Sequence, residues 1–349
     1  MEVRTNEGTA EELSQFVIGV WREAYAGRMA FPLWTADYFD WQLNLASSAA
    51  REHMLAAWCD GQLAGVLLGW SFACRRGERR DHAVLSSWLS VRPEFRGRGV
   101  VKALKAEQDA RMLAKGDGLV FAYRYYGSEH SLSKKPTADQ LASGRWDSRR
   151  VGFWVRILSP VRAANWYLNP WQRRVTLVGA PFTRSPRPPR YRDRIRRWEP
   201  GDLVGSVQLL QSRPRIACGI DWDAESLGRH CTGFGNCLVA EVDGAIRGLV
   251  TWHVLRFVGA TEEPVAILDI VAIETLPSSA QRAILNAALF EMKQQGGVFA
   301  LKLRTGDSPS LSMIQAGFIP WFADSFETLH SVAGPVTPIL DQPHHVLWR

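Results

Sequence analysis

The alternation of apolar and polar residues predicts a compact series of strands and helices in the first half of the chain. Apolar runs at residues 53–59 and 63–72 flank Asp60-Gly61, a dipeptide typical of the tight turn between antiparallel strands. A third apolar run, residues 83–91, stops before Pro93, and we expect it to pair with the first two. Residues 100–115 have helical apolar spacing and are followed by Gly116, a helix stop signal.

The segments on either side of this series extend the pattern. Thr9 and Glu12 form a capping-box signature at the start of a predicted helix, and residues 25–50 are rich in aromatic side chains. Residues 119–123 predict another buried strand, and residues 151–157 predict the strand that closes the first half.

The second half repeats this plan. Residues 236–252 have the strand, Asp-Gly turn, glycine and strand of residues 55–70 at the same spacing. A strand at 266–273, a helix at 280–295 and a strand at 298–304 follow. We therefore expect two units of one architecture, each with a sheet that is mostly antiparallel.

A segment of different composition separates the two series. Residues 160–200 are rich in proline, arginine and tryptophan, and proline at this density favours an extended linker. We expect an N-terminal domain over residues 1–160, a linker over 161–195 and a C-terminal domain over 196–349. The linker interleaves basic and aromatic residues, a composition that also suits RNA or a membrane face, although we favour a linker that crosses an acidic surface.

Length and composition agree with two folded domains. The chain has 349 residues, of which 46% are hydrophobic, and 15 are tryptophan. The formal charge of +7 favours anionic ligands without choosing among them. Five cysteines without a Cys-x-x-Cys pair indicate reduced thiols. Because the sequence lacks an apolar signal core and a membrane-spanning stretch, we expect a cytoplasmic location.

The turn between the third strand and the helix carries the most specific chemistry. It reads Arg96-Gly97-Arg98-Gly99 and leads directly into Val100. The first N–H groups of a helix are unpaired and attract anions, the glycines let a ligand approach the backbone, and the arginines add charge-assisted hydrogen bonds. This order of elements predicts a pyrophosphate site.

These residues resemble motif A of the GCN5-related N-acetyltransferases (GNAT), whose Arg/Gln-x-x-Gly-x-Gly/Ala pattern falls on Arg96, Gly99 and Val101. Val101 departs from it, since a small residue is usual there. The resemblance implies an α/β (α+β) fold with two tandem GNAT-like domains, each a mixed, mostly antiparallel central sheet flanked by helices. It also implies a bound acyl-CoA, by default acetyl-CoA, and no metal. The expected cofactor contacts are Leu89, Ser90 and Val91 for the pantetheine arm, and Arg96, Gly97, Arg98, Gly99, Val100 and Val101 for the phosphates.

The corresponding turn of the second half lacks the motif. Residues 273–280 contain Glu274 and Pro277 but no arginine and no Gly-x-Gly, and a glutamate would repel phosphate. The chain therefore resembles tandem acetyltransferases in which the second half is degenerate, and we expect one cofactor site per chain.

Acyl transfer needs a proton donor for the thiolate and a proton acceptor for the amine. Tyr125 and Tyr126 are the candidate acids, and Glu129 and His130 are the candidate bases nearest in sequence, with Glu23 and Asp40 as others. In several tandem members of the family the terminal carboxylate reaches the active site, so the resemblance adds the carboxylate of Arg349.

The expected function is transfer of an acyl group from acyl-CoA to a primary amine of a small molecule, by direct attack in a ternary complex. Two alternatives remain open: an acyl-CoA-binding regulatory protein without catalysis, and a protein that binds nucleic acid or a membrane through the basic linker. Nucleic acid is the less favoured partner, and the sequence leaves a homo-oligomer open.

Overall fold

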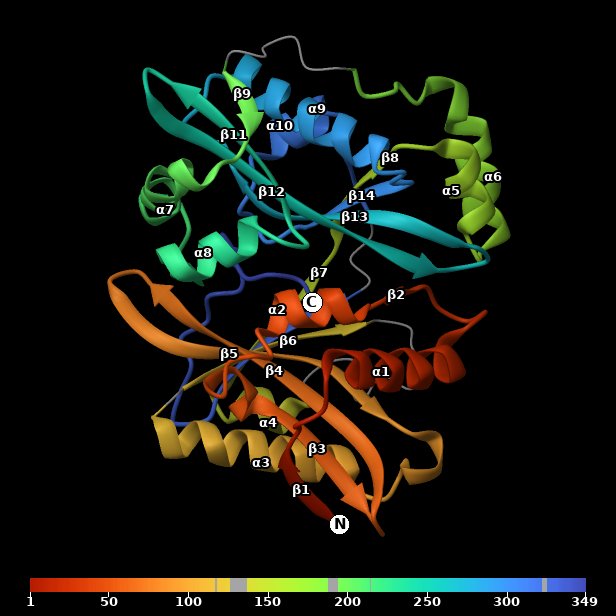
Figure 1. Ribbon diagram of the computed structural model, residues 1–349, viewed down its shortest axis with the longest axis vertical. Coiled ribbons are helices and arrows are strands. Elements are labelled where there is room, and N and C mark those ends of the chain that lie inside the picture. The colour runs from red at the N-terminus through yellow and green to blue at the C-terminus, as the bar shows by residue number, and fades with distance from the viewer. Residues whose placement is uncertain (117, 126–136, 188–193, 214, 322–324) are drawn as a thin grey trace.

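Two mixed sheets form the framework of the protein and follow one another along its long axis (Figure 1). They are seen in a computed structural model, which describes residues 1–116, 118–125, 137–187, 194–213, 215–321 and 325–349. Apart from the pairs β5–β6, β10–β17 and β13–β14, which are parallel, neighbouring strands are antiparallel. The expected fold class, with two GNAT-like halves of mixed, mostly antiparallel sheet, is confirmed.

The first sheet lies in the lower half of Figure 1. In order across the sheet, its strands are β1 (Glu2–Thr5), β3 (Met54–Cys59), β4 (Gln62–Arg76), β5 (Arg79–Val91), β6 (Leu119–Tyr125), β16 (Ser325–Ser331) and β7 (Trp146–Val151), with β10 (Cys218–Ile220) beside β4 and β17 (His344–His345) beside β10.

The second sheet lies in the upper half. Its strands are β15 (Ile319–Pro320), β8 (Phe153–Ile157), β14 (Phe299–Leu303), β13 (Glu262–Ala272), β12 (Ala245–Val258), β11 (Asn236–Val242) and β9 (Ile195–Arg197), with β2 (Phe31–Leu33) beside β12.

The α-helices of the described chain are α1 (Ala10–Tyr25), α2 (Ala36–Leu43), α3 (Val100–Lys115), α4 (Ala138–Ala142), α5 (Pro160–Trp166), α6 (Pro170–Gly179), α7 (Leu203–Gln211), α8 (Ala224–Cys231), α9 (Ser278–Gln294) and α10 (Ser310–Gln315). Short 3-10 turns occur at Ala49–His53, Pro93–Phe95, Ala180–Phe182 and Pro200–Asp202. None of the helices in these ranges has the length and apolar composition needed to cross a membrane.

The local predictions that position the site are confirmed. The β3–β4 turn has φ values of 50° at Asp60 and 77° at Gly61, and the β11–β12 turn repeats them with 52° at Asp243 and 73° at Gly244. Two positive φ values in a row are the geometry that Asp-Gly provides between antiparallel strands. Helix α1 begins after a capping box formed by Thr9 and Glu12.

The prediction of a closing strand over residues 151–157 is wrong. The extended chain breaks after Val151, where β7 ends at the edge of the first sheet, and β8 then pairs with β14 and β15 of the second sheet. The place beside β6 is taken by β16 from the end of the chain, because all seven of its residues pair with β6.

The prediction of an extended chain immediately after residue 160 is also wrong, because α5 and α6 occupy its first part. Both helices begin with proline, at Pro160 and Pro170, where the missing N–H would have no partner in the helix and the fixed φ already suits it. Proline density therefore does not exclude helices here.

Strands pass between the halves in both directions. β2 and β8 from the first half lie in the second sheet, whereas β10, β16 and β17 from the second half lie in the first sheet. One buried cluster accordingly contains Leu13, Val239 and Val346 together. The expected boundaries at residues 160 and 195 stay proposals, and the sheets and the core cross them.

Candidate functional site

A cavity of about 900 Å³ lies against β5 and the N-terminal end of α3. Its walls come from residues 86–91 of β5, the turn before α3, α3 itself, the C-terminal part of α1, strands β6 and β16, and Arg349. The cavity therefore joins the predicted phosphate turn to the strand that was expected to contact the pantetheine arm. Of the expected cofactor contacts, Leu89, Ser90, Val91, Arg96, Gly97, Gly99, Val100 and Val101 line it.

The turn before α3 has an open, glycine-dependent backbone. Gly97 and Gly99 have φ values of 76° and 81°, which L side chains rarely adopt, and a Cβ at either position would meet no atom within 4 Å. Gly99 is the N-cap, so the first amides of α3 have no intrahelical acceptor and carry the positive end of the helix dipole. This end can receive an anion against the backbone.

The two arginines of the turn are placed differently. Arg96 lines the cavity, and its Nε donates a hydrogen bond to the Val91 carbonyl at 3.2 Å. Arg98 is exposed, its guanidinium lies 5.4 Å from the centroid of the Phe95 ring, and it is not part of the cavity wall. We therefore expect Arg96 to contribute more than Arg98 to anion binding.

Strands β5 and β6 separate beside the cavity. They pair only from Ala83 with Leu119 to Leu85 with Phe121, so the later part of β5 has main-chain groups that β6 does not use. An extended ligand can add to this edge as another strand would. The pairing of the two strands therefore ends before the position where the pantetheine contacts were expected.

A β-bulge interrupts β5 at the same place. Val66 lies opposite Ser90 but Leu68 lies opposite Ser87, so the intervening residues of β5 are bulged and Trp88 has a φ of 50°. The Ser90 hydroxyl accepts a hydrogen bond from Trp21 Nε1 at 3.0 Å and donates one to the Trp88 carbonyl at 3.1 Å. A bulky residue with positive φ is rare and marks a strained backbone held by its surroundings.

Part of the cavity wall is cationic. Lys102, Lys105 and Arg124 line it, and burial together with the neighbouring Arg124 lowers the pKa of Lys105 to about 8, against the opposing effect of Asp109. An anion bound between these groups would relieve the repulsion and restore the charge on Lys105.

Another part of the cavity wall is apolar and aromatic. Trp21 contacts Tyr25 and Trp34 with ring centroids 4.9 and 4.8 Å apart, and these rings line the cavity with Val20 and Met29. Other aromatic residues between positions 25 and 50 belong to the hydrophobic core, as Tyr38 and Phe39 do, which are almost fully buried.

Arg349 lies between the halves and closes one side of the cavity. Its main-chain oxygen accepts a hydrogen bond from the Ser87 hydroxyl of β5 at 2.6 Å, and its Nη1 lies 2.5 Å from Oδ1 of Asp269 on β13. Its Nε also donates to Gln42 of α2. The last six residues of the chain are buried, and the role expected for the terminal carboxylate stays a prediction.

Asp269 was not anticipated from the sequence. It occupies a bulge in β13, because Thr251 pairs with Ile270 and Trp252 with Leu268. Burial alone would raise the pKa of this carboxyl, but Arg349 and His253 outweigh burial and hold the pKa below its usual range. Since both strands of the internal repeat carry a bulge, Arg349 connects the bulged region of β5 to that of β13.

Of the predicted catalytic residues Tyr125, Tyr126, Glu129 and His130, the structure describes only Tyr125. Tyr125 is the last residue of β6, where its backbone pairs with Ser325. Tyr126, Glu129 and His130 lie outside the described residues. Glu23 and Asp40 are exposed on α1 and α2 and do not line the cavity.

Tyr123 lines the cavity, whereas the sequence predicted only that it lies in a strand. Its hydroxyl lies 3.2 Å from Glu327 and 3.3 Å from the Val346 carbonyl. Burial, and then the Glu327 charge, raises its pKa well above the usual value, so it keeps its proton.

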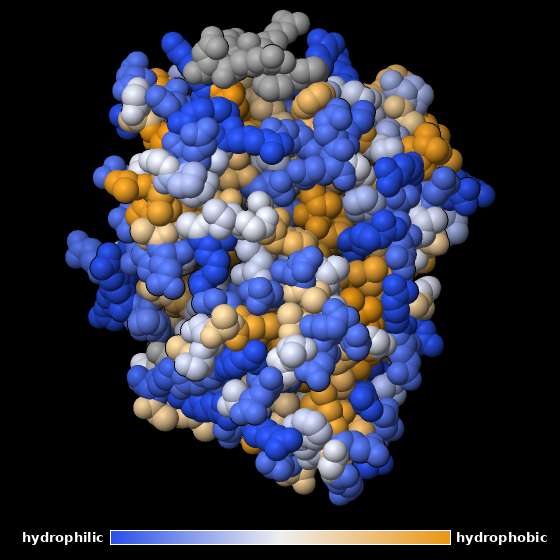
Figure 2. Space-filling model, in the orientation of Figure 1, coloured by the Kyte–Doolittle hydropathy of each residue, from blue (hydrophilic) through white to orange (hydrophobic). Residues whose placement is uncertain are grey.

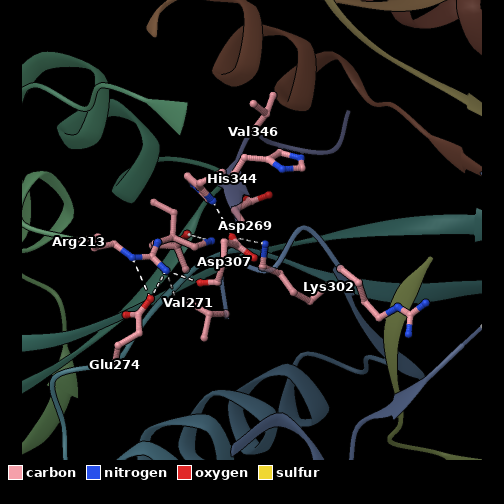
Figure 3. Close-up of polar contacts among 12 residues, drawn as sticks. Arg213, Asp269, Val271, Glu274, Lys302, Asp307, His344 and Val346 are labelled. Atoms are coloured by element: carbon pink, nitrogen blue, oxygen red, sulfur yellow. Dashed lines mark hydrogen bonds and ion pairs between the residues drawn. The ribbon is translucent and has the colours of Figure 1, made fainter. Parts of the chain in front are cut away.

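The corresponding turn of the second half is filled by the protein itself. Glu274 accepts hydrogen bonds from Arg213, including one from Nε at 3.0 Å, and Arg213 also donates to the carbonyls of Val271 and Asp307 (Figure 3). Arg213 is only 7% exposed. An internal carboxylate and its guanidinium thus occupy the turn where the first half has an open glycine backbone.

A second buried group adjoins this turn. Asp307 Oδ2 lies 2.7 Å from Lys302 Nζ and 2.7 Å from His345 Nδ1. Burial would raise the pKa of Asp307, but the neighbouring cations keep it low. Across the described ranges, no cluster of three or more His, Cys, Asp or Glu is placed to hold a metal ion, and the five cysteines are buried and unbridged.

Comparison with known proteins gives a family match for the first part of the chain. Residues 6–128 match the family model described as an acetyltransferase (GNAT) domain, which includes the cavity wall from α1 to β6. The match places a GNAT acetyltransferase domain, the domain of an acyltransferase, in this part of the chain, and the fold of the two halves agrees with it.

Solved structures share this fold over nearly the whole chain. Saccharomyces cerevisiae N-myristoyltransferase with bound myristoyl-CoA has a TM-score of 0.71 at 13% identity, covering 97% of this chain and 84% of that one. A GCN5-related N-acetyltransferase from Kribbella flavida has a TM-score of 0.52 at 13% identity, covering 95% and 72%. One from Anabaena variabilis has a TM-score of 0.50 at 10% identity, covering 94% and 72%. No curated protein matches the sequence.

Proposed function

We propose that the protein transfers an acyl group from acyl-CoA to a primary amine of a small molecule, by direct attack in a ternary complex. The observation that carries the proposal is one cavity whose wall includes the Gly97–Gly99 turn, the bulged part of β5 and the aromatic rings of Trp21 and Trp34. These three parts match the three chemical parts of acyl-CoA, namely phosphates, an extended amide-bearing arm and an acyl chain.

The phosphate part is supported by charge and by the backbone. The pyrophosphate would accept hydrogen bonds from the first amides of α3 and from Arg96, and Lys102 and Lys105 would add cationic contacts. The pantetheine amides would pair with the main chain of Leu89, Ser90 and Val91, which β6 leaves free beyond Leu85.

We propose a donor with an acyl chain longer than acetyl, as an alternative to the default acetyl-CoA. The apolar part of the wall beside Trp21, Tyr25 and Met29 supports it, because acetyl would leave much of this surface without a ligand group. One structural neighbour contains myristoyl-CoA. A series of donors from acetyl-CoA to myristoyl-CoA with one amine separates the two alternatives, since kcat/KM rises with chain length for a long-chain enzyme and falls for an acetyltransferase.

The bond changes define what the site must supply. The amine nitrogen attacks the thioester carbonyl, the carbon–sulfur bond breaks, one proton leaves the amine and one reaches the thiolate. We retain Tyr125 or Tyr126 as the proposed acid and Glu129 or His130 as the proposed base. Tyr123 has its hydroxyl engaged by Glu327, so we assign it a positioning role at the cavity wall.

The direct experiment measures CoA release from acetyl-, octanoyl- and myristoyl-CoA against a panel of small amines. Amine-dependent release that follows Michaelis–Menten kinetics, with the acyl-amine found by mass spectrometry, supports the proposal. Tight CoA binding without release for every amine would instead favour the non-catalytic alternative. Absence of CoA binding would contradict both.

A further inference from the structure

An exposed apolar ridge on α6 lies outside the acyl-CoA site. Trp171, Val175 and Val178 occur at i, i+4 and i+7, so they share one face of the helix, and they are 63%, 48% and 74% exposed. Phe182, in the short turn that follows, is 84% exposed. Thr176, on another face, is buried. The helix thus directs its apolar stripe toward solvent, the reverse of a surface helix that packs on a core.

The support beneath α6 is firm. Helix α5, to which α6 is joined, buries Ala163 and Ala164 completely, and Trp166 Nε1 donates to the Phe257 carbonyl of β12 at 3.2 Å. The two helices lie at the edge of the upper half of the molecule, and Figure 2 shows hydrophobic residues among hydrophilic ones along that edge. Helix α5 therefore anchors α6 to the second sheet, and the ridge stays on the surface of the protein.

The charged residues of the segment that carries the ridge are all basic, and one of them, Arg162, pairs with Glu263 of β13. Residues 160–187 contain five arginines and no acidic residue. Arg173 and Arg174 are exposed beside the apolar stripe and form no ion pair with any residue that the structure describes, and Arg184 and Arg187 follow close behind Phe182. A partner surface must therefore accept apolar side chains at its centre and offer negative charge around them.

We propose that this ridge docks the protein on an anionic lipid bilayer, with the ridge inserted at the level of the headgroups. Tryptophan and phenylalanine favour that interface, and arginines at the border of the ridge would reach lipid phosphates. A second copy of the chain fits less well, because a symmetric contact would bring the same arginines together. Nucleic acid fits less well because valines offer neither stacking nor hydrogen bonds.

The test is co-sedimentation of the full chain with vesicles of phosphatidylcholine alone and of phosphatidylcholine mixed with phosphatidylglycerol. We expect binding to the mixed vesicles, weaker binding at high salt, and little binding to the neutral ones. The triple variant Trp171→Ser, Val178→Ser, Phe182→Ser should bind at least about tenfold less, since burying one large apolar side chain changes a partition constant by about that factor. Arg173→Glu with Arg174→Glu should also weaken binding.

Matched controls keep the test specific. The variant Leu113→Ser, Leu311→Ser, Ile314→Ser removes three exposed apolar side chains elsewhere, and Arg28→Glu with Arg79→Glu reverses two exposed charges elsewhere. Both should bind vesicles like the parent, and all variants should keep its thermal unfolding midpoint. Equal loss in variant and control, no binding to anionic vesicles, binding to polyuridine in place of vesicles, or a ridge-dependent dimer without vesicle binding would each overturn the proposal.

Discussion

Nη1 of Arg349 lies 2.5 Å from Oδ1 of Asp269, and both side chains are almost completely buried. The pair joins the last residue of the described chain, in the wall of the cavity, to the bulge of β13 in the other half. The second half thereby helps to build the site, although its own turn holds no cofactor motif. Removing either charge would leave the other buried without its main partner.

Asp269→Asn tests this connection. We expect the free energy of unfolding to fall by roughly 3–5 kcal/mol, because an uncompensated guanidinium remains in the interior. Urea denaturation measures the change. Asp243→Asn, the same chemical change in an exposed turn, is the control and should stay close to the parent. If Asp269→Asn lowered the free energy of unfolding by less than about 1 kcal/mol, the pair would not hold the halves together.

Substitution of the two arginines of the turn should lower the affinity for CoA to different extents. Arg96→Ala removes a cation that lines the cavity and should weaken CoA binding by about tenfold or more. Arg98→Ala removes one that stacks on Phe95 at the surface and should have a smaller effect. Fluorescence competition with a labelled CoA measures both. Equal losses, or a larger loss for Arg98→Ala, would place the phosphates on the outer side of the turn.

The lowered pKa of Lys105 predicts a pH dependence of cofactor binding. Because this pKa is about 8 in the free protein, Lys105 is charged below that pH and becomes neutral as the pH rises through it. Bound phosphate favours the charged form, so the contribution of Lys105 is complete only well below pH 8, and binding requires increasing proton uptake as the pH rises through it. CoA affinity should therefore fall as the pH rises from about 7 to about 9.

The matched variant for that experiment is Lys105→Arg, which stays charged throughout the range. Its affinity should resemble that of the parent at the low end and lose the fall through pH 8. Calorimetry in buffers of different ionisation enthalpy would detect the proton uptake directly. If the CoA affinities of the parent and of the variant depended on pH in the same way, Lys105 would not contribute to the phosphate site.

Local signals in the sequence were sufficient for the elements around the cofactor turn. The Asp-Gly dipeptides, the Thr9 and Glu12 capping box and the glycines at both ends of α3 each act through backbone geometry within a few residues. The predicted cofactor contacts from Leu89 to Val101 could therefore be proposed from this short stretch of sequence alone.

The features that were missed depend on distant pairing. β16 lies beside β6 although some 200 residues separate them, so no local pattern in either strand announced it. The same holds for Asp269, whose role follows from its contact with Arg349, and for Tyr123, whose hydroxyl meets Glu327. The ridge on α6 escaped prediction because prolines can begin helices as well as interrupt them.

The central claim is that the open glycine turn before α3 binds one acyl-CoA per chain. The most direct measurement is isothermal titration of myristoyl-CoA, and in parallel acetyl-CoA, into the parent, Gly99→Leu and Gly116→Leu. Both glycines cap α3 with similar φ values of 81° and 76° and open space around them, so both substitutions carry the same backbone strain, but only Gly99 lines the cavity. The account predicts about one site per chain in the parent and in Gly116→Leu, and no measurable site in Gly99→Leu. Two comparable sites per chain, or a site that survives in Gly99→Leu, would contradict it.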